Sequence, residues 1–281
     1  MTNLVLQGPG SRFRRLPDIL ALMIYFSRFI LTPLALLTVG RQACGQEGPS
    51  PMSSDIANSV QTLVKMHQVW GAKASTASAS LTIKEASRSG PVVSFRLYAQ
   101  GLPKDGVYSI LAWPVTQRLP IEVQKGVTLD ASGLAICAGI PGTCGSADKP
   151  DDPIDLAVSP APGEPLRLAL VSVDGATKVF AKTVPVPLLG EDRGCTVEAT
   201  ILTPAAELVL IEGSGFSANG DITMDSSSEG ERHGGKRKAD PDGRYVTAIL
   251  PAKQGVKAGT AKVTLKSADC SPTVTFAWGR R

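Results

Sequence analysis

The chain has 281 residues, 43% of them hydrophobic, which is enough to bury the core of one large or two ordinary domains. Its 28 glycines and 21 prolines, with only 5% aromatic residues, favour short strands joined by tight turns and argue against a helical bundle. The formal net charge is +4, but the first 45 residues hold five arginines and one acidic residue. Without them basic and acidic residues are equal in number, which argues against nucleic-acid binding.

Residues 1–45 are expected to form a secretory signal peptide. Arginines precede the apolar stretch FILTPLALLTVG (29–40), and Ala43 and Gly45 supply a small-x-small cleavage site. Met23 begins a segment that has ordinary signal-peptide proportions by itself, so it is an alternative start. We therefore expect an exported protein that is periplasmic, at the cell surface or extracellular.

Two alternatives for this N-terminal segment stay open. One is an uncleaved membrane anchor over residues 19–40, which Arg28 disfavours because a charge inside the membrane is costly. The other is a lipoprotein anchored on Cys44, although the residues before it lack the expected apolar side chain. Contact with a membrane is expected only through this segment, if it is not cleaved.

Residues 46–78 are expected to form a Pro/Ser-rich lead and a short amphipathic helix. Ser53–Asp55 supply candidate N-cap residues. Apolar side chains then recur near helical spacing at Ile56, Val60, Leu63, Val64 and Trp70. We expect this helix to pack on its own domain, and docking to a partner is the alternative.

Residues 79–186 are expected to form a first β-sandwich. Its strand candidates are rich in Val, Ile, Leu and Thr, and they read SLTIKEA, VVSFRLYA, VYSILAWPV, GVTLDASGLAIC, IDLAV, PLRLALVSV and TKVFAKTVPV. Asp-Gly stands between apolar runs in LPKDGVY and SVDGATK, which predicts a hairpin at each. Prolines and charged turn residues then predict a linker over residues 187–194.

Residues 195–281 supply a second series of strands. They read CTVEATILT, ELVLIEG, GDITMDSS, GRYVTAILP, TAKVTLKSA and TVTFAWG, and no convincing helix follows residue 79. The expected fold class is all-β, with two tandem immunoglobulin-like β-sandwich domains after a signal peptide and a short N-terminal helix.

Cysteine usage agrees with export, because four cysteines remain after the signal peptide. In an oxidising compartment they predict two disulfides, Cys137–Cys144 across the loop CAGIPGTC and Cys195–Cys270 across the second domain. A zinc site is the alternative, but the chain has no Cys-x-x-Cys and only two histidines. We therefore expect no metal and no cofactor.

The glycine-rich stretch IEGSGFSANGDI (211–222) follows an apolar run and invites a catalytic interpretation. Phosphate-binding glycines and a nucleophile elbow both need a helix after the strand, and the sequence instead continues into another strand. The segment GFSAN also has Asn219 where an elbow needs a second glycine. We expect these glycines to permit a turn and close packing, with Phe216 buried.

Two further clusters of polar residues match a functional site only in part. A Ser-His-Asp set can be assembled from 226–228, His233 and Asp240, but serine-rich loops supply such sets by chance. Asp240 and Asp242 resemble half a calcium loop, but Lys238 and an apolar strand occupy the positions of the missing ligands. We expect a hairpin turn there and no catalytic residues.

The segment TPAAELVLIEGSGFSANGDI resembles the opening of immunoglobulin-like domains of the IPT/TIG type. The matching residues are Pro204, Gly213, Gly215, Phe216, Asn219 and Gly220. The later DPDGRYVTAILPAKQGVKAGTAKVTL is similar to the close of such modules. The resemblance covers about 85 residues and implies a small Greek-key sandwich used for adhesion, spacing or binding, with no catalytic residues.

The expected function is that of a non-catalytic binding or structural protein of the cell envelope, which contacts a protein or glycan through loops. The candidate contact loop is 226–243, with the side chains His233, Lys236, Arg237 and Lys238. A secreted hydrolase or a carbohydrate-binding accessory module is the alternative. The tryptophans that could stack on sugars are expected in the core instead, at Trp70, Trp113 and Trp278.

Overall fold

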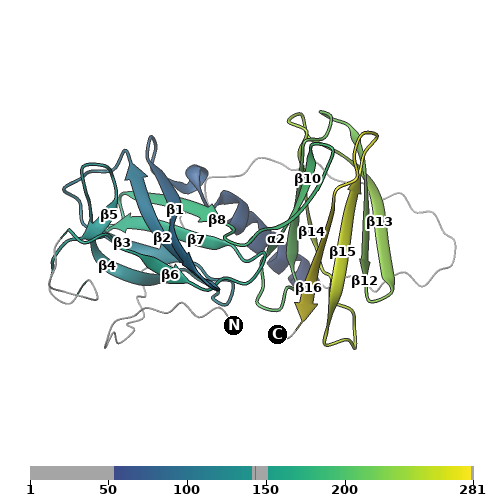
Figure 1. Cartoon of the computed structure of the whole chain (residues 1–281), viewed down its shortest axis with the longest axis horizontal. Helices are drawn as coiled ribbons and strands as arrows, with labels where there is room; N and C mark the ends of the chain where they lie inside the picture. The colour runs from purple at the N-terminus through teal and green to yellow at the C-terminus, as the bar shows by residue number, and fades with distance from the viewer. Residues whose placement is uncertain (1–53, 141–142, 144–150, 280–281) are drawn as a thin grey trace.

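The structure is a computed structural model that describes residues 54–140, 143 and 151–279 (Figure 1). This part of the chain contains four antiparallel β-sheets, preceded by one short α-helix, α2 (Ser54–Val69). The predictions of an all-β fold and a short N-terminal helix are therefore confirmed. The expected signal peptide lies outside the described residues, and no helix within them is both long and apolar enough to cross a membrane.

The first eight strands form what we call the N-terminal sheet pair. One sheet has the order β1-β2-β6 and the other has the order β5-β4-β3-β7-β8. Alternate side chains of β2 are buried, as the period of a strand dictates, and the apolar core fills the space between the sheets. The strands are β1 (Ser80–Ser89), β2 (Val92–Gln100), β3 (Tyr108–Ala112), β4 (Ile121–Leu129), β5 (Ala135–Cys137), β6 (Leu156–Val158), β7 (Leu166–Ser172) and β8 (Lys178–Thr183).

The remaining strands form the C-terminal sheet pair. Its two sheets have the orders β14-β11-β10-β9 and β13-β12-β15-β16, with a second apolar core between them. The strands are β9 (Leu188–Asp192), β10 (Cys195–Ile201), β11 (Val209–Ser214), β12 (Asp221–Ser228), β13 (Glu231–Lys238), β14 (Tyr245–Ile249), β15 (Ala258–Lys266) and β16 (Thr273–Gly279). The expectation of a linker over 187–194 is wrong, because β9 pairs with β10 there.

The two sheet pairs have the same strand order. Counted from β1 and without β5, the first, second and fifth strands form one N-terminal sheet, and the other has the order fourth, third, sixth, seventh. Counted from β10, and without β9 at the edge beside it, the C-terminal strands follow the same order. The chain therefore builds one topology twice, although its sequence shows no clear residue-level repeat.

Helix α2 lies between the two sheet pairs (Figure 1). One group of its side chains, including Met66, packs against Trp113 and Phe180 on the five-stranded sheet. Another group, including Val64, packs against Leu210 and its neighbours on the β14-β11-β10-β9 sheet. The helix was expected to pack on its own domain, but it stabilises the junction between both sheet pairs.

Backbone hydrogen bonds also cross this junction. Gly163, in the connection between β6 and β7, accepts a hydrogen bond of 2.8 Å from the backbone amide of Ile201, at the end of β10. The amide of Gly163 donates to the carbonyl oxygen of Val186, also at 2.8 Å. The two sheet pairs are thus joined directly and not through a free linker.

The two predicted Asp-Gly hairpins have different outcomes. Asp174 and Gly175 lie in the turn between the paired strands β7 and β8, so this hairpin is confirmed. Asp105 and Gly106 instead connect β2 with β3, which belong to different sheets. The second prediction is wrong because a local turn signal does not say whether the chain returns to the same sheet or crosses to the facing one.

Candidate functional site

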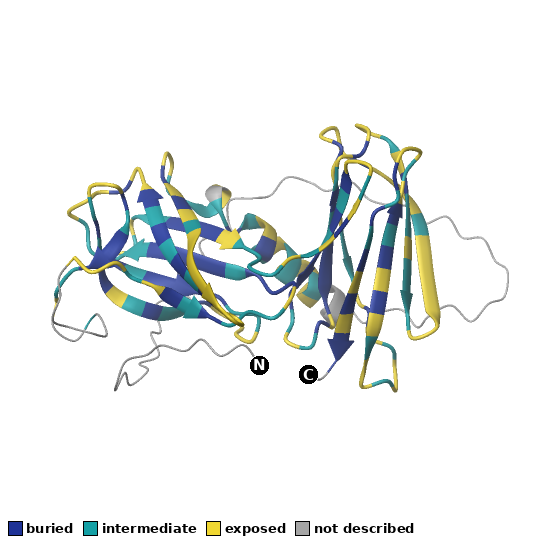
Figure 2. Ribbon diagram, in the orientation of Figure 1, coloured by how far each residue is buried: buried dark blue, intermediate teal, exposed yellow. Residues whose placement is uncertain are grey.

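The candidate contact segment 226–243 is not a long loop. It contains the end of β12, a two-residue turn at Glu229 and Gly230, and the whole of β13. β13 pairs with β12 through eight consecutive residue pairs without a register shift. Figure 2 shows β13 as an almost fully exposed strand at the edge of its sheet.

The predicted contact residues lie on both faces of β13, because neighbouring side chains of a strand point to opposite faces. Lys236 is opposite Thr223 and Lys238 is opposite Asp221, on the outer face of the sheet. Arg237 is opposite the buried Ile222, so its side chain is on the face that turns towards the second sheet. Arg232 joins the outer row, and His233 joins the row of Arg237.

The charge of this edge is only weakly compensated. Within the described residues, no ion pair engages Arg232, Lys236, Arg237 or Lys238. The imidazole of His233 lies 3.8 Å from the carboxylate of Glu231, at the turn end of the strand. We define these five basic residues of β13 as the basic edge.

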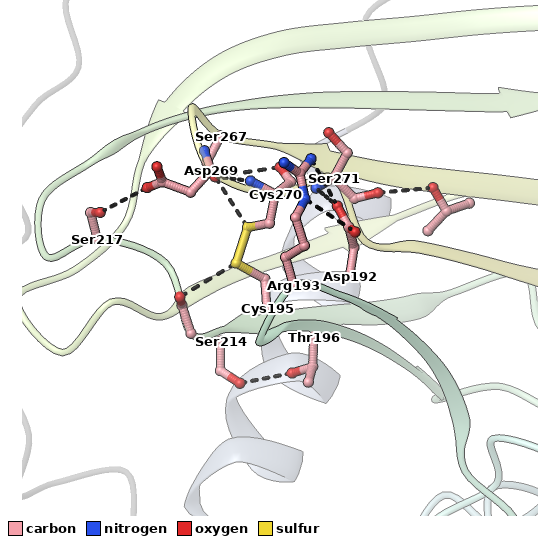
Figure 3. Close-up of a disulfide and its surroundings, with 12 residues drawn as sticks. Asp192, Arg193, Cys195, Thr196, Ser214, Ser217, Ser267, Asp269, Cys270 and Ser271 are labelled. Carbon is pink, nitrogen blue, oxygen red and sulfur yellow. Dashed lines mark hydrogen bonds and ion pairs between the residues drawn. A yellow bond between two sulfur atoms is a disulfide. The ribbon is translucent and has the colours of Figure 1, made fainter.

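A disulfide joins Cys195 and Cys270, as predicted, and closes the C-terminal sheet pair near one end (Figure 3). Their Cα atoms are 6.2 Å apart, a separation that a disulfide spans without backbone movement. Beside it, the backbone amide of Ser271 donates a 2.6 Å hydrogen bond to Asp192 and lowers the pKa of that carboxyl group. The bond fixes β9 to the turn before β16.

The second predicted disulfide involves Cys137, at the end of β5. This cysteine is disulfide-bonded. Its predicted partner, Cys144, lies outside the described residues.

The assembled catalytic set does not meet in a catalytic arrangement. The Ser226 hydroxyl lies 3.3 Å from the backbone carbonyl oxygen of His233 and donates to it, not to the imidazole. Asp240 accepts hydrogen bonds from the backbone amides of Asp242 and Arg244 at 2.9 and 2.8 Å. These bonds build a turn before β14, so the expected turn at the aspartates is confirmed. It is not a hairpin, because it connects β13 to β14, which belong to different sheets.

The other histidine, His67, is buried in α2 with 2% of its surface exposed. Burial, and then the charges of Lys182 and Arg167, lower its pKa from 6.5 to about 3. Its Nδ1 atom has no hydrogen-bond partner among the described residues. A neutral imidazole without access to solvent has no route to a substrate proton.

Sequence reasoning missed a group of charges at the junction. Arg167 is 3% exposed and stacks on Trp113, with the guanidinium carbon 3.9 Å from the ring centroid, and burial lowers its pKa to about 10. Glu198 lies directly opposite Glu212 on neighbouring strands, and burial and then the charge of Glu212 raise the pKa of Glu198. Only the tertiary structure brings these residues together, so no local signal identifies them.

The positions of the tryptophans and of the His, Cys, Asp and Glu side chains bear on two alternatives, sugar binding and metal binding. Trp70, Trp113 and Trp278 are 7%, 1% and 3% exposed, which confirms their prediction as core residues. They offer no stacking platform for a sugar. Within the described ranges, no group of three or more His, Cys, Asp or Glu side chains is arranged to hold a metal ion.

Comparison with protein-family models and with curated protein sequences gives no match. Among solved structures, the chain is similar to a crystal structure of a tetra-tandem repeat in the extending region of a large adhesion protein, with 13% sequence identity and a TM-score of 0.23. The match covers 73% of this chain and 48% of that one, so the chain spans about half the length of that structure. A similarity this low carries no argument about fold or role.

Proposed function

We propose that the chain is an exported, non-catalytic binding or structural protein of the cell envelope, built from two tandem immunoglobulin-like β-sandwiches. The shared strand order of the sheet pairs carries this proposal. In immunoglobulin-like lettering, β10, β11 and β14 correspond to strands A, B and E, and β13, β12, β15 and β16 correspond to C′, C, F and G. The N-terminal pair supports the same assignment, with β5 as one additional strand.

For the C-terminal pair we propose the IPT/TIG type. Gly215 has a φ of +82°, and the next residue, Phe216, is 6% exposed and belongs to the apolar core. Asn219, with a φ of +56°, forms the turn into β12. These features support the resemblance of the sequence motif. The Cys195–Cys270 disulfide departs from the usual immunoglobulin bridge, since it joins strand A to the F–G turn.

The proposed location rests on the disulfides. Cysteines that pair in the folded chain are typical of an oxidising compartment. The filled cores, the buried His67 and the backbone bonds of Asp240 favour a binding or structural role over hydrolysis. We propose the basic edge of β13 as the contact surface, because it combines exposure with a positive charge that is only weakly compensated.

Fractionation of the producing cell, with N-terminal sequencing of the mature chain, tests this proposal. We expect a chain that begins near Gln46 in an exported fraction, and a non-reducing peptide map with two disulfide-linked peptide pairs. A full-length chain in the cytosol with all five cysteines as free thiols would overturn the proposed location. Serine-hydrolase activity that a mechanism-based fluorophosphonate probe labels would overturn the non-catalytic role.

A further inference from the structure

Strand β13 leaves one complete backbone edge open. It is the terminal strand of the β13-β12-β15-β16 sheet, and among the described strands it pairs only with β12. Among the edge strands that the structure describes, only β1 is longer, and its register shifts between Glu85 and Ser87. An unbroken edge of eight residues presents a row of backbone donors and acceptors that an extended peptide can use.

Two glycines occupy the centre of this edge strand. At Gly235 an added Cβ would make only ordinary contacts, the nearest at 3.7 Å to the Arg237 side chain. At Gly234 it would lie 3.2 Å from the Asp225 carboxylate and 3.3 Å from the backbone carbonyl oxygen of Met224, so these neighbours would have to shift slightly. Neither glycine has a positive φ, and the register shows no bulge. Interior glycines weaken a strand, and where the fold does not require them they mark a close approach of another backbone.

Basic side chains flank the glycines on both faces of the strand. Arg232, Lys236 and Lys238 are on the outer face, and His233 and Arg237 are on the other. A polysaccharide lying on the outer face would contact one of these rows. A peptide strand that pairs with the edge has its own alternate side chains beside both rows.

The same charges make self-association unfavourable. Two copies of β13 paired edge to edge would bring like charges into neighbouring positions, which is destabilising. An acidic partner is attracted by these charges. The basic edge therefore favours an acidic partner over a second copy of the chain, and it also protects the strand from pairing with itself.

We propose that β13 binds an extended acidic segment of another polypeptide, which adds to the β13-β12-β15-β16 sheet as a fifth strand. This inference rests on the proposed binding role of the protein. Main-chain hydrogen bonds hold the segment along the edge, and carboxylates on both of its faces pair with the basic edge.

Titration of the purified protein with a blocked ten-residue peptide tests this proposal. The peptide has glutamates on both faces of the extended chain and threonines at its centre, and its control carries N-methyl groups on all of its central backbone nitrogens. The control keeps the charge, but neither of its edges can donate the hydrogen bonds of a β-ladder. We expect at least tenfold weaker binding of the control, and hydrogen-exchange protection of β13 amides only with the unmodified peptide. Equal affinity of the two peptides would overturn strand addition.

The protein variant K236E/R237E reverses one charge on each face of β13 and is expected to weaken peptide binding at least tenfold. The matched control K65E/K73E makes the same charge change at exposed positions of the N-terminal region and is expected to stay within twofold. Equal weakening by both variants would overturn a site at β13, as would tighter binding of heparin than of the peptide at the same edge. Loss of peptide binding by a protein found in an exported fraction overturns only this inference, whereas peptide binding by a cytosolic protein overturns only the proposed location.

Discussion

The Lys182 ammonium group donates a 2.9 Å hydrogen bond to the backbone carbonyl oxygen of His67, which ties strand β8 to α2. Burial lowers the pKa of Lys182, and the carboxylates of Glu212 and Glu198, in the C-terminal sheet pair, act in the opposite direction. One side chain therefore interacts with the helix and with both sheet pairs. Removing one charged side chain from this group leaves the remaining buried charges without a partner. We therefore expect substitutions at the junction to destabilise the protein as core substitutions do.

The first prediction concerns the pH dependence of stability. The folded-state pKa of His67, about 3, is below its ordinary 6.5, so the unfolded chain binds a proton that the folded chain excludes. The contribution of this pKa difference to the free energy of unfolding is fully present above pH 6.5 and is lost as the pH falls towards 3. Between pH 7 and pH 5 we expect His67 to account for a loss of about 2 kcal/mol in the free energy of unfolding.

Urea denaturation of the wild type and His67→Leu at both pH values measures this loss. The variant is expected to lack this part of the pH dependence, whatever its absolute stability. The control His233→Gln changes an exposed imidazole and is expected to retain the wild-type dependence. An unchanged pH dependence in His67→Leu would contradict the assignment.

The second prediction concerns the aromatic contacts of Trp70, the residue that directly follows α2. Trp70 is 5.4 Å from Trp113 and 4.9 Å from Phe180 between ring centroids, and its indole N–H donates to the carbonyl oxygens of Leu168 and Ala181. Trp70→Ala removes these contacts and is expected to lower the free energy of unfolding by roughly 3–5 kcal/mol.

Chemical denaturation measures the effect of Trp70→Ala. The control is Val173→Ala, which truncates an apolar side chain that is 80% exposed and is expected to change stability by less than about 0.5 kcal/mol. Similar values for the two variants would show that the contacts of Trp70 with the five-stranded sheet do not stabilise the protein.

The third prediction concerns the Cys195–Cys270 disulfide, which closes a segment of 75 residues. Its removal in C195A/C270A frees the unfolded chain and is expected to cost about 4 kcal/mol. Guanidinium denaturation in the absence and presence of a reductant tests this value. The reductant is expected to lower the wild-type midpoint strongly, whereas the midpoint of C195A/C270A should move much less. A variant that unfolds at the wild-type midpoint without reductant would show that the bond contributes no stability.

Most of the strands could be predicted because burial imposes a period of two on their sequences. The alternation along β2 and the apolar run of β11 are local signals, and the structure has a strand at each. The Cys195–Cys270 pairing was also predictable, from the even cysteine count and the position of these two cysteines at the ends of one unit.

Strands β9 and β13 were missed for opposite physical reasons. β9 is short and follows two prolines, so its sequence indicates a linker, whereas its strand conformation depends on pairing with β10. β13 has no buried apolar side chain, and its sequence ERHGGKRK lacks the pattern that burial would impose. Its partner β12 supplies the hydrogen bonds that make it a strand. The basic edge was therefore identified by residue type but not as a strand edge.

The last prediction returns to the glycine-rich stretch at the end of β11. Gly215 has a φ of +82°, and a Cβ there would come within 2.3 Å of the carbonyl oxygen of Gly194, which belongs to the backbone and cannot rotate away. Gly194 has a similar φ of +86°, but a Cβ there would meet nothing within 4 Å. Gly194→Ala is therefore expected to cost about 1 kcal/mol through backbone strain alone, and Gly215→Ala roughly 3 kcal/mol or more.

Thermal denaturation of both variants measures the difference between their losses in stability. The cost of a positive φ is common to both variants, so this difference reports the close approach of the Gly215 and Gly194 backbones. Equal losses would mean that only the turn conformation, and not the packing beside Phe216, requires glycine at position 215.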